Sequence, residues 1–246
     1  MDRIIYTTMT GASAAANRQA VLANNLANVS TQGFRAELST FRSVPVQGEG
    51  STTRVFALEA TAGHSTLPGS VQRTGRSLDA MAEGNAWFAV QGLDGTEAYT
   101  RNGAFEVSSG GVLVNGLGLP VLSDGGTPID IPPDSEIALG ADGSLSVKTG
   151  DQPVANLGRI KLVTPTDENP IKRSEDGLFR ASAGDALPSD AAARLQTGAI
   201  EGSNVNAVET MVGMIAAARQ FEQQMRLLQT AETDDKSASQ LLNMQG

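Results

Sequence analysis

Side chains able to act as nucleophiles, bases or metal ligands are sparse in this sequence. The 246 residues contain one histidine, His64, and no cysteine. A Ser-His-Asp triad would have to use His64, which stands in the stretch TAGHSTLPG and is expected in an exposed loop. Disulfides, thiol catalysis and thiolate zinc sites are excluded, and a single histidine does not make a zinc site. These observations argue against an enzyme built on histidine or cysteine.

Acidic side chains gather in the stretch DGGTPIDIPPDSE but do not form a recognisable site. Asp124, Asp130 and Asp134 lack the regular spacing of a calcium loop, so we expect solvated acids in turns. Two carboxylates suffice for glycoside hydrolysis, so a hydrolase is not excluded outright, although aromatic platforms for sugars are few. NGLGLP lacks the Lys-Ser/Thr of a phosphate loop. The residues therefore predict no cofactor, no metal and no small-molecule substrate.

Charge and hydropathy narrow the choice of partners. The formal net charge is −9, which argues against nucleic acid and anionic membrane surfaces as partners. No segment approaches ~18 continuous apolar residues, so we expect no transmembrane span. The N-terminal stretch lacks the continuous apolar segment of a cleaved signal peptide. For the same reason the Asn28-Val29-Ser30 match to a glycosylation sequon carries no weight.

A heptad pattern near the N-terminus predicts a helix, the first element that could position functional side chains. Steps of three and four run without a break through Ile5, Thr8, Ala12, Ala15, Gln19, Leu22, Leu26 and Val29. Such spacing places these residues on one face of a helix. Gln19 is its polar member. Either the seam drifts so that Gln19 reaches water, or Gln19 sets register against partner helices.

A second heptad pattern occupies the C-terminal region. It runs through Ala207, Met211, Met214, Ala218, Phe221, Met225 and Leu228, and is broadened by Val208, Val212 and Ile215. Asn204 is the expected N-cap, because its side chain can accept from free N–H groups of the first turn. We expect a bend near Thr233-Asp234-Asp235, where the seam weakens before Leu242.

The middle of the chain has a different pattern. Short apolar runs such as AWFAV, VLVNG, GSLSV and GRIKLV are separated by Asp-Gly pairs at 94–95, 124–125, 142–143 and 176–177. Asp-Gly supplies the positive φ of tight hairpin turns, so we expect short antiparallel strands in a sandwich or irregular barrel. Trp87 and Phe88 are either core of this domain or a lateral contact to neighbouring subunits.

The predicted fold is therefore α+β. Residues 1–34 and 200–246 form a coiled-coil-like domain of paired terminal helices, residues 35–69 an extended connector with one or two strands, and residues 70–199 an inserted β-rich domain. The N-terminal seam has four large apolar side chains, worth ~1.5–3 kcal/mol each when buried. Ordering each residue costs on the order of 1–2 kcal/mol. We therefore expect the terminal helices to be disordered in a free monomer and to order against other subunits.

Three stretches in order along the chain resemble bacterial flagellar axial proteins, the rod, hook and hook-associated subunits. NNLANVSTQGF at 24–34 is similar to the family's N-terminal motif, and GNAWFAVQGLDGTEAYTRNGAFEV begins the matching middle segment at 84. EGSNVNAVETMVGMIAAARQFEQQMRLLQTAE, from 201, resembles the closing helix, with Glu201, Asn204 and Glu209 at expected places. No Leu-Tyr-Gln segment follows Phe34, which favours a proximal-rod over a distal-rod member.

The resemblance implies a structural role in motility. Family members are exported unfolded by the flagellar type III export machinery without a cleaved signal. They assemble helically with copies of themselves and other rod proteins in the basal body, crossing the periplasm, with terminal helices lining the axis of a hollow drive shaft. A distal-rod or hook subunit is the first alternative, and a peptidoglycan-active hydrolase is the second.

The asparagine cluster before Gly33 fits the end of a helix that turns sharply. Asparagine and glycine tolerate left-handed backbone there. We expect Gly33 to take positive φ and Phe34 to fill an apolar site. The asparagines either bind backbone of the turn or of a neighbouring helix, or are solvated amides at a frayed helix end. The expected assembly interface comprises Ile5, Ala12, Ala15, Gln19, Leu22, Asn24, Asn25, Leu26, Asn28, Val29, Gly33, Phe34, Asn204, Val208, Met211, Met214, Ile215, Ala218, Phe221, Met225 and Leu228.

Overall fold

The chain divides into two compact units. A computed structural model describes residues 4–45, 55–150 and 152–243, with side chains at 4, 59–62, 235, 238 and 241–243 left undescribed. One unit combines residues 1–27, 37–63 and 205–246, and the other combines 28–36 and 64–204. We call them the helical unit and the β-rich unit. An α+β chain with helices at both ends and a β-rich middle is thus confirmed, but residues 28–34 cluster with the β-rich unit instead of the helices.

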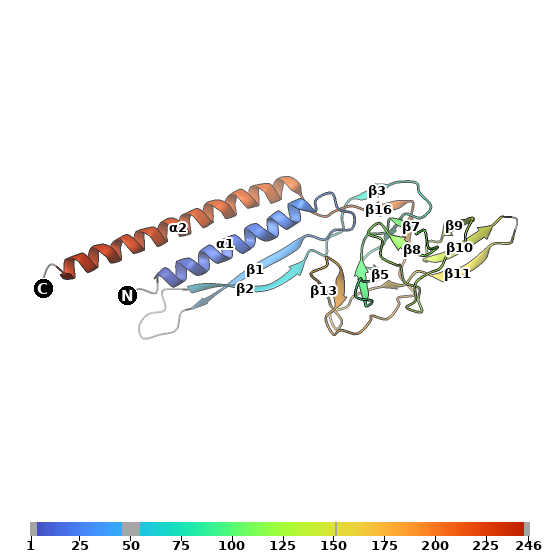
Figure 1. Cartoon of the computed structure of the whole chain (residues 1–246), viewed down its shortest axis with the longest axis horizontal. Helices are drawn as coiled ribbons and strands as arrows, with labels where there is room; N and C mark the ends of the chain where they lie inside the picture. Colours follow the sequence, from blue (N-terminus) through green and yellow to red (C-terminus); the bar gives the residue numbers. More distant parts are fainter. Residues whose placement is uncertain (1–3, 46–54, 151, 244–246) are drawn as a thin grey trace. The chain divides into compact units, whose positions relative to one another are not determined.

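The helical unit contains two long helices and a pair of strands (Figure 1). Helix α1 spans Ile4–Ala27 and α2 spans Ala207–Asn243. Strands β1 (Glu37–Pro45) and β2 (Val55–His64) pair in a two-stranded sheet beside α1. They are the strands expected in the connector.

The two helices pack against each other and run antiparallel. A Cβ atom added at Gly213 would lie 3.2 Å from Leu22 Cδ1, and one added at Gly11 would lie 3.0 Å from Gln224 Cδ. Buried Ala12 and Ala15 share this face of α1. Small residues therefore let the helices approach closely, as the predicted α1 seam requires.

The face of α2 that packs on α1 differs from the predicted seam at Met211 and Met225, whereas the other five predicted members are half-buried. Its buried or half-buried residues are Ala207, Thr210, Gly213, Met214, Ala217, Ala218, Phe221, Gln224, Leu228 and Ala231. Met211 is 50% exposed and Met225 is 39% exposed, so their prediction as members of the helix-pairing seam is wrong. The reason is steric, because the close approach at Gly11 and Gly213 brings the Thr210–Ala217–Gln224 side inward.

The N-cap predicted for α2 is wrong. Asn206, and not Asn204, caps the helix, since its Oδ1 accepts from the N–H groups of Val208 (3.1 Å) and Glu209 (3.3 Å). The helix also continues without a break through 233–235. An i,i+4 pair of Lys236 with Glu232, at 2.7 Å, supports the helix across that stretch.

The β-rich unit consists of short strands, and its described strand pairs are all antiparallel. A five-stranded sheet has the order β12-β5-β6-β14-β13, formed by Leu162–Val163, Trp87–Gln91, Glu97–Thr100, Phe179–Ala181 and Ile171–Arg173. A three-stranded sheet has the order β11-β10-β9, formed by Ala155–Arg159, Ser144–Thr149 and Ser135–Leu139. Two-stranded pairs complete it: β15-β4 (Leu195–Thr197, Ala80–Ala82), β16-β3 (Ala199–Glu201, Val71–Arg73) and β7-β8 (Phe105–Val107, Leu113–Asn115).

Asp-Gly turns join several of these strands as predicted. Gly95, Gly143 and Gly177 have φ of 78°, 85° and 81°. The pair at 124–125 is different, because Gly126 (φ 76°) takes the left-handed position in its place. The sheets enclose a core that includes Phe88, Phe105, Leu113, Leu145 and Ile160. This unit thus has the apolar core of an independently stable domain.

Candidate assembly interface

Asn25, one of the three asparagines near the end of α1, holds the helix end to β1. Its amide is 6% exposed and binds the backbone of Glu37 in both directions. Asn25 Nδ2 donates to Glu37 O at 3.0 Å, and Glu37 N donates to Asn25 Oδ1 at 2.8 Å. One amide therefore fastens the end of α1 to the start of β1, as expected for an asparagine binding backbone.

The other asparagines have different surroundings. Asn28 organises the turn after α1, because Thr31 donates to it from both its N–H and its hydroxyl at 3.1 Å. Asn24 is exposed.

Gly33 and Phe34 behave as the sequence predicts. Gly33 has φ of 69°, and its N–H donates to Glu201 O at 2.8 Å. A Cβ at this position would lie 2.4 Å from the carbonyl carbon of Arg101, within its backbone. Phe34 is buried under the guanidinium of Arg173, which lies 4.2 Å from the ring centroid. Gly33 is therefore needed both for its φ and for close approach.

A buried ion triad holds the same region of the β-rich unit. Arg35 Nη2 lies 2.8 Å from Glu201 Oε1, and Arg101 Nε and Nη2 both lie 2.6 Å from Glu201 Oε2. All three residues are at most 2% exposed. Gly69 N also donates to Glu201 Oε1 at 2.8 Å. Burial lowers the pKa of Arg35, while the charge of Glu201 opposes that shift.

The triad joins the two segments that continue into the helices along the chain. Arg35 follows α1 in sequence, and Glu201, at the end of β16, precedes α2. Asn204 adds to this junction, accepting from Ala36 N at 2.6 Å and donating to Leu67 O at 2.8 Å. We call residues Gly33, Arg35, Arg101, Glu201 and Asn204 the clasp. No pattern in the sequence indicated a role for Arg35, because a single arginine does not reveal which distant carboxylate it pairs with.

Aromatic residues surround the clasp. Trp87, on β5, is 2% exposed, and Phe88 is fully buried, so both belong to the core and not to a lateral surface. His64 is half-buried and packs edge-on, with its ring centroid 4.7 Å from Phe179 and 5.9 Å from Trp87. The prediction of His64 as an exposed loop residue is therefore wrong. Burial lowers the pKa of His64, and the charges of Arg35 and Arg173 lower it further.

The helical unit carries a row of apolar side chains that face away from α1. On α2, Val208 is 71% exposed, Val212 is 61%, Ile215 is 55% and Met211 is 50%. These four residues cover two turns of one helix face. We call them the outward stripe. Met225, Met214, Ala218, Phe221 and Leu228 of the predicted interface lie outside it, the last four at least partly covered by α1.

On α1, the predicted residues lie on the covered side. Ile5, Gln19, Leu22 and Leu26 are half-buried, and Val29 lies half-buried beyond the helix end, in the β-rich unit.

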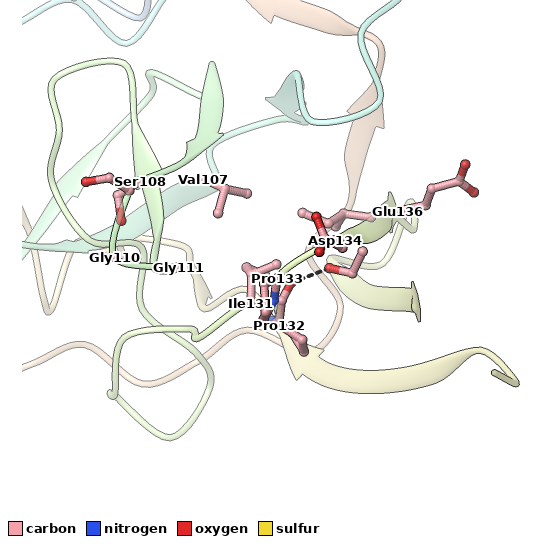
Figure 2. Close-up of a pocket in the computed structure, with 12 residues that line it drawn as sticks. Val107, Ser108, Gly110, Gly111, Ile131, Pro132, Pro133, Asp134 and Glu136 are labelled. Carbon is pink, nitrogen blue, oxygen red and sulfur yellow. Dashed lines mark hydrogen bonds between the residues drawn. The ribbon is translucent and has the colours of Figure 1, made fainter. Parts of the chain in front are cut away.

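An open hollow of about 650 Å³ lies in the β-rich unit (Figure 2). Val107, Ser108, Ile131, Pro132 and Asp134 are among its lining residues, and Ser135 Oγ donates to Pro132 O at 2.6 Å across it. Asp134 has a left-handed φ of 54°. Asp134 and Glu136 line the hollow, whereas Asp124 and Asp130 do not. All four acids of this stretch are exposed, as predicted for solvated carboxylates.

The described residues contain neither a metal-binding cluster nor a membrane-spanning helix. No group of three or more histidine and acidic side chains is arranged to hold a metal ion among them. Within the described part of the chain, neither helix is long and apolar enough to cross a bilayer.

Comparison with known proteins agrees with the resemblance in the sequence. Three family models match: a flagella basal body rod protein model over 5–35, a flagellar hook protein FlgE/F/G D1 domain over 81–147, and a flagellar basal body rod FlgEFG protein C-terminal model over 196–241. The flagellar basal-body rod protein FlgF of Salmonella typhimurium is 45% identical, covering 99% of this chain and all of that protein. The Escherichia coli FlgF is 44% identical with the same coverage, and the Bacillus subtilis rod protein FlgG is 30% identical over 99% of both chains. The two FlgF proteins match 99% of this chain, including both helices, the clasp and the β-rich unit. The chain therefore belongs to the family of flagellar basal-body rod proteins.

Proposed function

We propose that this chain is a structural subunit of the proximal flagellar rod and not an enzyme. It assembles helically with copies of itself and other axial proteins into a hollow drive shaft, which transmits torque and conducts exported subunits. The identity to the FlgF proteins of Salmonella typhimurium and Escherichia coli, 45% and 44%, exceeds the 30% to the Bacillus subtilis FlgG, which favours the proximal position over the distal one. Export by the type III machinery, without a cleaved signal, and a location in the periplasmic part of the basal body belong to the same proposal.

One observation carries the proposal: the helical unit has almost no core of its own. Among its described side chains, the buried ones are small or polar: Ala12, Ala15, Asn25, Thr210 and Ala217. Large apolar side chains such as Leu22 and Phe221 are only half-buried. Complete burial of such side chains is worth ~1.5–3 kcal/mol each, and this unit does not obtain it alone. Neighbouring subunits can supply the missing contacts.

The outward stripe is the surface of the helical unit best suited to contact neighbouring subunits. It continues the apolar character of α2 around the helix from the side that packs on α1. Contiguous exposed apolar residues of this kind mark protein–protein contacts. In this proposal α2 packs on α1 of its own chain with one face and on helices of neighbouring axial subunits with the outward stripe. The coiled-coil-like bundle predicted for the axis is thus an intersubunit structure.

The test is a charge placed in the outward stripe. Ile215→Asp should leave export and the folding of the β-rich unit intact but abolish rod assembly and swimming. Gln220→Asp is the matched control, because Gln220 is exposed on the same helix outside the outward stripe, and that strain should swim. A normally motile Ile215→Asp strain would refute this role of the stripe.

A second measurement addresses the isolated subunit. Circular dichroism of dilute protein, proven monomeric by sedimentation, should give less helix than the 24 and 37 residues of α1 and α2. Full helix content in a monomer would count against the proposal. Subunit position in an intact basal body would distinguish proximal rod from distal rod or hook, and a wall-hydrolysis assay on purified protein tests the enzymatic alternative.

A further inference from the structure

The single histidine of the chain lies against its single tryptophan. The ring of His64 meets Trp87 at 89° with centroids 5.9 Å apart, and Phe179 at 67° with centroids 4.7 Å apart. Trp87 and Phe179 lie 4.6 Å from each other. We call these three rings the aromatic cluster. Trp87 lies on β5 and Phe179 on β14, both in the five-stranded sheet, whereas His64 is the last residue of β2.

Cationic side chains approach the aromatic cluster from three elements. Arg35, from the segment after α1, and Arg101, from the end of β6, lie 5.9 and 5.8 Å from the Trp87 ring centroid. Arg173, on β13, lies 5.7 Å from the Phe179 ring centroid. Glu201 is the carboxylate paired with Arg35 and Arg101. An imidazolium at His64 would therefore be a further positive charge beside guanidiniums, in a half-buried site.

We propose that His64 makes the packing of the aromatic cluster depend on pH. The neutral imidazole packs against Trp87 and Phe179, and its protonation loosens these contacts. Because Arg35 rests against Trp87 and is paired with Glu201, loosening reaches the clasp. This inference does not depend on the proposed function, since it concerns the folding of the β-rich unit alone.

The direction of the effect follows from proton linkage. The pKa of His64 is lowered in the folded chain, by burial first and then by Arg35 and Arg173. In the unfolded chain it returns to about 6.5. Above that pH both states are neutral and the contribution to stability is complete. As pH falls from about 6.5 to the lowered pKa, the unfolded state binds the proton first, so stability is lost across that window.

The chain offers an unambiguous experiment, because one histidine and one tryptophan each give one signal. The proton NMR resonance of the His64 imidazole in the full chain should titrate with a midpoint below about 6.5. Trp87 emission should change with the same midpoint, since an imidazolium quenches a neighbouring indole. An imidazole midpoint at or above that value overturns the proposal whatever the variants do.

The matched variant is His64→Phe, which keeps an aromatic ring and removes the proton. Between pH 7 and pH 5 the unfolding equilibrium constant of the native chain should rise at least about threefold more than that of His64→Phe. The Trp87 transition should be absent in the variant. Equal pH dependence in both chains, or an unchanged Trp87 transition in the variant, overturns the proposal. If His64→Phe does not fold, His64→Gln replaces it, and the titration of the native chain decides the question by itself.

Discussion

Replacing Gly33 by alanine separates two reasons for a glycine. The left-handed φ of 69° is one reason, and the close approach of the Arg101 and Asn102 backbone is the other. An added Cβ would lie 2.4 Å from the carbonyl carbon of Arg101 and from the amide nitrogen of Asn102. Neither is the end of a flexible side chain, so the backbone of the clasp itself must move.

The matched control is Gly75→Ala, in the same unit. Gly75 has φ of 73°, and a Cβ there would meet no atom within 4 Å. It therefore measures the left-handed conformation alone, ~1–2 kcal/mol. Gly33→Ala adds overpacking of ~1–3 kcal/mol and strain on the N–H···O bond to Glu201. We expect Gly33→Ala to lower the free energy of unfolding by roughly 2–5 kcal/mol in total.

Urea unfolding of the full chain, followed by Trp87 fluorescence, measures both variants. Trp87 is the only tryptophan and is 2% exposed in the β-rich unit, so its emission reports the unfolding of that unit. Gly33→Ala should unfold at clearly lower urea than Gly75→Ala. Equal midpoints would refute the assignment of the close contact. In cells, the larger Gly33→Val should prevent rod assembly, and a normally motile strain carrying it would contradict the same reasoning.

Two further changes test the clasp and the helix cap. Glu201→Gln leaves the guanidiniums of the triad without their carboxylate, so it should lower the free energy of unfolding by ~3–5 kcal/mol in the Trp87 assay. Its control is Glu232→Gln, which removes a carboxylate from an exposed ion pair and should leave the urea midpoint unchanged. Equal effects of the two substitutions would contradict the buried triad. Asn206→Ala should cost ~1 kcal/mol of helix stability, seen as earlier loss of the circular dichroism signal. Asn204→Ala should instead shift the Trp87 transition, and a reversed pattern would mean that Asn204 is the cap after all.

Local patterns in the sequence were sufficient for much of the fold. The α1 seam, the positive φ of Gly33 and the Asp-Gly turns were all predictable, because each depends on neighbouring residues along the chain. The helical ends and the β-rich middle follow from periodicity alone. The resemblance of three stretches to flagellar axial proteins gave the family, which the full-length relatives confirm.

Pairings between distant residues required the tertiary structure. Helical periodicity marked Met211 and Met225 for the seam, but the closeness of Gly11 and Gly213 turned Gln224 inward instead. Asn204 looked like a cap until Ala36 and Leu67 were brought to it.

The sequence by itself determined the elements, their order and the family. Only the tertiary structure decided that Arg35, Arg101 and Glu201 share one buried site and that His64 packs on Trp87. The physical reason is range: backbone preferences act over a few residues, whereas the ion pairs of the triad join side chains 166 and 100 positions apart in the chain, and no local pattern encodes their formation.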